Sequence, residues 1–111
     1  MKSYKLVVFV PAEAGPALRS ALFAAGAGAQ GAYRECAGWV EGTGQFRPLP
    51  GAQPALGQVG AVEQVREWRL ELLLEEKVLA AVLQALHRHH PYEEPAYDLF
   101  ERLDPRPWRG S

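Results

Sequence analysis

The stretch "VREWRLELLLEEKVLAAVLQALHRHH", residues 65–90, decides the fold because its apolar spacing changes period within a single run. In the first part, apolar and charged side chains alternate, as in a strand with one buried face. The alternating apolar residues are Trp68, Leu70, Leu72 and Leu74. In the second part, the apolar residues recur at helical spacing and are Val78, Leu79, Val82, Leu83 and Leu86. The sequence therefore predicts a strand over residues 65–74 and a helix over 75–89 that ends before Pro91.

Two further elements are predicted ahead of this stretch. Residues 4–10, "YKLVVFV", form a short β-rich run that Pro11 ends, and their nearly continuous apolar centre suits a central strand. In residues 13–25, leucine and alanine recur at helical spacing, and Gly26 follows as a natural stop. The first part of the chain is therefore predicted to be a strand followed by a helix.

The middle of the chain predicts a second strand and a long loop. Residues 33–40 alternate like a strand, and "EGTG" after them favours a turn into a short return strand around Gln45 and Phe46. The next run holds three prolines and three glycines, which exclude an uninterrupted helix or central strand. We therefore expect a long loop over residues 42–60, and loops of this length in compact domains are often functional.

A closing strand over residues 96–100 completes the predicted order strand, helix, strand, strand, helix, strand. This order is the split β-α-β pattern of a ferredoxin-like α+β sandwich (βαββαβ), an antiparallel sheet with two helices on one face. Single domains commonly contain about 100–150 residues. We therefore expect one domain over residues 1–101 and a C-terminal tail over residues 102–111.

Charge and composition narrow the classes of function. Twelve basic and thirteen acidic residues give a net charge of −1, which argues against nucleic acid as a partner. The chain lacks the ~20 consecutive apolar residues that a membrane span needs, so no membrane association is expected. The lone Cys36 cannot form an intramolecular disulfide, and the N-terminal apolar run is too short for a secretory signal. We therefore expect a cytoplasmic protein.

All three histidines lie at the end of the predicted second helix. A cation there complements the helix dipole by roughly 0.3–1 kcal/mol, so capping is the simplest interpretation of His87, His89 and His90. His90 also continues the apolar stripe, which favours a partly buried histidine held by one hydrogen bond. A third interpretation is a divalent-metal site, although there is no HExxH motif and no set of thiolates. Its candidate ligands are His87, His90, Glu93 and Asp98.

The carboxylates and the loop offer a second set of candidate groups. Glu93 and Glu94 are adjacent and, in extended chain, point to opposite sides, which is poor geometry for one acid/base pair. The structural alternative is that Glu94 and Pro95 form a rigid approach to the last strand, while Glu93 pairs with an arginine or a helix end. In the loop, Gln45 and Arg47 lie among glycines and suit an anion, but no phosphate-binding motif accompanies them.

Two separated motifs carry a resemblance to a known family. They are "GTGQFRPLPGAQPALGQVG", residues 42–60, and "HPYEEPAYDL", residues 90–99. Together they resemble the inserted domain of Nif-three-like dinuclear-metal-centre proteins, the YqfO group, in a free-standing form. The resemblance covers nearly all of residues 4–100, with Gln53 at a position where the familiar loop pattern has asparagine. It implies a fold similar to the PII and CutA proteins, which typically assemble as trimers through their sheets.

The resemblance implies an oligomeric binding or regulatory module, and we expect a homotrimer with no catalytic residues. The expected ligand-binding residues are Gln45, Arg47, His90, Tyr92, Glu93 and Glu94. In the larger relatives the metal ligands belong chiefly to flanking halves, so that dinuclear site is not transferred to this chain. The alternative is a small metal-binding protein or metal-dependent hydrolase that uses the histidine and glutamate cluster with a divalent metal. A third expectation is docking to a separate Nif-three-like partner protein.

Overall fold

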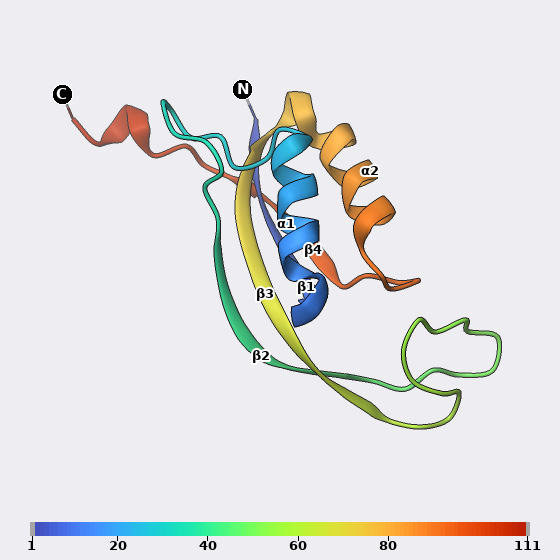
Figure 1. The fold of residues 1–111 in the computed structure, drawn as a ribbon. Helices are drawn as coiled ribbons and strands as arrows, with labels where there is room; N and C mark the ends of the chain where they lie inside the picture. Colours follow the sequence, from blue (N-terminus) through green and yellow to red (C-terminus); the bar gives the residue numbers. More distant parts are fainter. Residues whose placement is uncertain (1, 111) are drawn as a thin grey trace.

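The computed structural model describes residues 2–110, and these form one four-stranded antiparallel sheet with both long helices on one side (Figure 1). The strand order is β2-β3-β1-β4. In chain order the main elements are β1 (Ser3–Pro11), α1 (Gly15–Ala24), β2 (Gly38–Phe46), β3 (Glu63–Glu75), α2 (Leu79–His89) and β4 (Tyr97–Arg102). This arrangement confirms the predicted ferredoxin-like βαββαβ sandwich.

The core lies between the sheet and the two helices. In β3 the predicted apolar face is buried, and β1 pairs beside it with Leu6 opposite Leu72 and Val8 opposite Leu70. From the helices, the fully buried side chains are Leu18, Leu22, Val82 and Leu86. Complete burial of one such side chain stabilises the fold by roughly 1.5–3 kcal/mol. The two periodic patterns of residues 65–90 therefore supply much of the core.

Both helices end as the sequence predicts. After α1, Gly26 adopts a φ of 112°, a left-handed conformation that favours glycine. Its N–H donates to the Phe23 carbonyl and that of Ala27 donates to the Leu22 carbonyl, both at 3.0 Å, which is a Schellman cap. After α2, His90 is extended, with φ −80° and ψ 132°, because Pro91 disfavours helical geometry in the residue before it.

The prediction of a second strand over residues 33–40 with a turn at "EGTG" is wrong. In the structure, β2 begins at Gly38 and continues straight through those residues to Phe46, paired with β3 along its whole length. Glycine weakens a strand but can still join the ladder, and β3 offers a long antiparallel partner for this edge strand. Residues 33–37 lie outside any strand, and Glu35 there has a positive φ of 57°.

The predicted element boundaries also shift by a few residues; α1, β3 and β4, for example, were predicted over residues 13–25, 65–74 and 96–100. The long loop covers residues 47–62, because Gly42 to Phe46 belong to β2. Glu75 ends β3, and a short 3-10 turn, Glu76–Val78, precedes α2. Past β4, the C-terminal segment forms one 3-10 turn, Arg106–Trp108, at the opposite end of the molecule from the loop (Figure 1). Within residues 2–110, no helix is long and apolar enough to cross a lipid bilayer.

Candidate functional site

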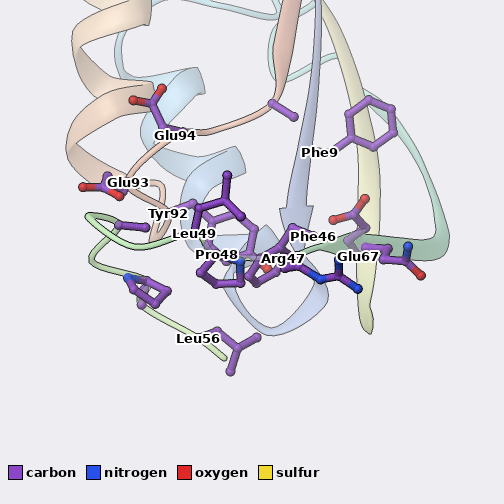
Figure 2. A pocket seen from close by; sticks show the side chains of 15 residues that line it. Phe9, Phe46, Arg47, Pro48, Leu49, Leu56, Glu67, Tyr92, Glu93 and Glu94 are labelled. Carbon is purple, nitrogen blue, oxygen red and sulfur yellow. The ribbon is translucent and has the colours of Figure 1, made fainter. Parts of the chain in front are cut away.

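A cavity of about 330 Å³ opens where the long loop folds back against the segment between α2 and β4 (Figure 2). Its apolar wall comes mainly from β1, the end of β2 and the loop, and its largest side chains are Phe9, Phe46, Pro48, Leu49 and Leu56. Its polar groups are Gln45, Arg47, Glu67, Tyr92, Glu93 and Glu94. An apolar cleft of this size with a few polar groups is the usual form of a small-molecule site.

His90 holds the α2–β4 segment in place beneath this cavity. The side chain is only 5% exposed, and its Nε2 lies 2.7 Å from the carbonyl oxygen of Phe9. The Tyr92 N–H donates to the other ring nitrogen, Nδ1, at 3.1 Å. A ring that donates from Nε2 and accepts at Nδ1 is neutral. Burial accordingly lowers the pKa of His90, although the hydrogen bond to Phe9 opposes this shift. His90 is therefore a buried structural residue with two hydrogen bonds.

Tyr92 forms part of the cavity lining, and its ring packs edge-on against Phe46 with centroids 5.5 Å apart. Its hydroxyl is buried and has no hydrogen-bond partner among the described residues. Burial raises the pKa of Tyr92, and the negative charges of Glu67, Glu13 and Glu63 raise it further. A buried hydroxyl without a partner carries a free-energy cost that a ligand hydrogen bond can remove.

One hydrogen bond ties the long loop to the other wall of the cavity. The main-chain N–H of Gln53 donates to Oε1 of Glu93 at 3.2 Å, between residues 40 positions apart. Glu93 was predicted to pair with an arginine or a helix end, and it accepts this loop amide instead. The two walls of the cavity are therefore joined by a contact between the two motifs that carried the family resemblance.

Glu67 lies in the cavity wall beside Gly44, in the neighbouring strand β2. A Cβ at Gly44 would occupy the position of the Glu67 carboxylate, so this glycine provides the space in which the acid lies. Burial raises the pKa of Glu67. Within residues 2–110, no salt bridge or hydrogen bond to a Glu67 side-chain oxygen is formed. The carboxylate is thus half-buried, without a cationic partner and next to the cavity.

Five of the six predicted ligand-binding residues line this one cavity, although they come from two distant stretches of the chain. They are Gln45, Arg47, Tyr92, Glu93 and Glu94. The sixth, His90, supports the site from behind. Sequence reasoning missed Glu67 and Phe9, because strand alternation alone places both on the face away from the helices. The sequence signal for Glu67 was Gly44 in the neighbouring strand, because a residue without a side chain there leaves space for the Glu67 carboxylate.

The predicted metal ligands are not brought together in one chain. His87 Nε2 lies 2.8 Å from the Tyr97 hydroxyl, and both ring nitrogens of His90 are already hydrogen-bonded. Among residues 2–110, no group of three or more histidine, cysteine, aspartate or glutamate side chains is arranged to hold a metal ion. The set His87, His90, Glu93 and Asp98 therefore does not fit a metal within a single chain, and metal binding stays a prediction.

Comparison with known proteins gives matches over almost the whole chain, while no family model matches it. A Mycobacterium leprae protein named GTP cyclohydrolase 1 type 2 homolog is 48% identical over 101 residues, covering 91% of this chain and 26% of that protein. A solved Bacillus cereus protein related to NIF3 is 38% identical with a TM-score of 0.79, covering 93% of this chain and 26% of its own. The CutA protein of Archaeoglobus fulgidus shares the fold at a TM-score of 0.62 and 14% identity, covering 88% and 81% of the two chains.

The fold and these comparisons show that the protein is a ferredoxin-like α+β domain of the CutA type. The chain is the counterpart of one segment of the Nif-three-like proteins, as its two motifs predicted, and so is a relative of that family. It spans about a quarter of the length of the curated relatives it matches.

Proposed function

We propose that the domain is a non-catalytic module that binds a small molecule in the cavity between the long loop and the α2–β4 segment. The observation that carries the proposal is the Tyr92 hydroxyl, which is buried without a hydrogen-bond partner among the described residues, beside a cavity that combines an apolar wall with several polar groups. Ligand binding would close the loop further over Tyr92 and so change the surface offered to a partner. The reactions named for longer relatives would then belong to the parts of those proteins that this chain does not match.

Ligand binding is tested by filling the cavity without changing its charge. Ala52 is half-buried and lines the cavity, so Ala52→Trp should block it, while Ala61→Trp places the same ring at an exposed loop position. The probes are GTP, ATP, phenylalanine and phenethylamine, followed by thermal shift and calorimetry. We expect at least one probe to stabilise the wild type and Ala61→Trp but not Ala52→Trp. If no probe stabilises any of the three proteins, or if Ala52→Trp responds like the wild type, the proposed binding function is wrong.

We also propose that the module assembles as a homotrimer through the face of the sheet opposite the helices. Both long helices lie on the other side (Figure 1), and this open face includes Val40 and Phe100, which are 62% and 55% exposed. They lie on the two edge strands β2 and β4, with the charged Lys5, Glu71 and Arg69 of β1 and β3 between them, so they would contact neighbouring subunits at the edges of this face. Phe100→Asp should shift the sedimenting species toward monomer without lowering the content of secondary structure, and wild-type protein that sediments only as monomer would contradict the assembly.

The remaining proposals on partners follow from charge and from the relatives. The net charge of −1 supports the absence of a nucleic-acid partner. In the longer relatives the matching segment makes up about a quarter of the protein, and the rest of the chain is joined to it covalently. We therefore propose that this domain docks to a separate Nif-three-like scaffold. Co-purification of the domain with a scaffold lacking it would support the docking, and a failure to associate at micromolar concentrations would oppose it. A cytoplasmic location remains a prediction.

A further inference from the structure

We infer that the cavity selects a small amine with an apolar body, and not a nucleotide or another anion; this inference rests on the proposed binding function. Three observations point to that ligand class. They concern the charges that surround the cavity, the polar groups left free inside it and its size.

The charges around the cavity are mostly negative. Its lining holds three acids, Glu67, Glu93 and Glu94, and one base, Arg47. Two more acids, Glu13 and Glu63, lie near enough to the Tyr92 hydroxyl to disfavour its ionisation. A cleft lined by one sign of charge attracts the opposite sign and repels its own. A ligand with several phosphates would meet these five acids with two arginines to offset them, Arg47 in the lining and Arg69, whose guanidinium lies 5.9 Å from the centroid of the Phe9 ring.

The free polar groups suit an ammonium ion. The Glu67 carboxylate has no cationic partner among the described residues, and burial already makes its charge costly. The unpartnered Tyr92 hydroxyl has oxygen lone pairs that can accept a hydrogen bond. An ammonium group donates three hydrogen bonds and accepts none, so it suits the unpaired Glu67 carboxylate. Within the apolar lining, Phe9 and Phe46 offer ring surfaces to an apolar body.

The size of the cavity agrees with this class. Ligand pockets generally measure roughly 300–1,000 Å³, and at about 330 Å³ this one is at the small end. One aromatic ring or a branched aliphatic chain with a short polar end fits that space. A nucleoside triphosphate is larger than such a ligand and would bring its phosphates against the acids of the lining.

A charge series with one common ring tests the inference on the full 111-residue chain by calorimetry. The probes are phenethylamine, phenylalanine, 3-phenylpropanoate and 2-phenylethanol, with GTP as the nucleotide. We expect phenethylamine to bind more tightly than phenylalanine, and 3-phenylpropanoate and GTP to be the weakest. Glu67→Gln should weaken phenethylamine by about tenfold, since a charge-assisted bond becomes neutral, and should leave 2-phenylethanol unchanged.

Glu101→Gln is the matched control, because it removes one exposed carboxylate from β4, outside the cavity lining. It should bind every probe like the wild type. If 3-phenylpropanoate or GTP binds more tightly than the amine and Ala52→Trp abolishes that binding, the inferred amine class is wrong while the binding function stands. If Glu67→Gln weakens the binding of 2-phenylethanol as strongly as that of phenethylamine, the proposal that the Glu67 charge binds the amine is wrong. If no probe shows binding that depends on an open cavity, the proposed function itself fails.

Discussion

His90 joins the end of α2 to β1 through a contact of 2.7 Å between its Nε2 and the carbonyl oxygen of Phe9, 81 positions earlier in the chain. Its second nitrogen accepts the Tyr92 N–H at 3.1 Å. One neutral imidazole therefore fixes the segment that carries Tyr92 and Glu93 into the cavity. Of the three interpretations that the sequence left open for His90, the cap, the buried hydrogen-bonded histidine and the metal ligand, the structure matches the second.

The buried imidazole makes folding stability depend on pH. Burial lowers the pKa of His90 below its ordinary value of 6.5. Above 6.5 the ring is neutral in both the folded and unfolded chain; below it, the unfolded chain gains a proton that the folded chain resists, so stability falls. We expect the wild-type Tm to drop from about pH 8 to pH 5 and to drop less in His90→Gln. His89→Gln, which changes an exposed histidine, should follow the wild type. An equal slope in His90→Gln would contradict the assignment.

The hydrogen bond between the Gln53 amide and Glu93 should control how firmly the loop is held. Glu93→Ala removes the acceptor, and one such bond is worth about 1 kcal/mol. We expect faster amide exchange at Gln53 and in residues 47–62, with little change in the strands. Glu94→Ala is the control, because Glu94 lines the cavity without bonding that amide. Equal exchange in the two variants would show that the bond does not hold the loop.

The sequence predicted the elements whose pattern is local. The alternation of residues 65–74 and the helical stripe after it depend only on neighbours along the chain, so β3, α2 and their buried faces follow directly. Gly26 and Pro91 act on their own backbone, and both helix ends were predicted from them. These features were enough to establish the order of elements and hence the fold class.

The sequence could not predict features that depend on partners far along the chain. β2 passes through Gly42 and Gly44 because β3 lies beside them, and a local pattern sees only a turn in such glycines. The candidate site joins the loop to residues 40 positions away, so its two halves looked unrelated. Glu67 has the alternation of a solvent-facing acid, and only the pairing of β2 with β3 brings its carboxylate into the space beside Gly44.

The start of α1 provides a packing prediction. Gly15 is buried, and a Cβ there would overlap the ring of Trp68. Gly15→Ala should therefore destabilise the fold by about 1–3 kcal/mol, because overpacking outweighs the gain in helix propensity. Gly38→Ala makes the same chemical change in β2, where a Cβ meets open space, and should change stability by less than about 0.5 kcal/mol. Urea denaturation compares the two, and equal midpoints would show that the ring moves aside freely.

An experiment can distinguish a metal-binding role of His90 from its role in packing. Both nitrogens of His90 and the Nε2 of His87 already have partners, so a metal would have to break bonds that hold the fold. We expect neither excess Zn²⁺ nor a chelator to change the Tm of the tag-free chain. His90→Ala should lower the Tm by the same amount with and without the metal, because it leaves the Phe9 carbonyl and the Tyr92 N–H without their partner. A rise in Tm with Zn²⁺ that disappears in His90→Ala would instead establish a metal site and restore the alternative function.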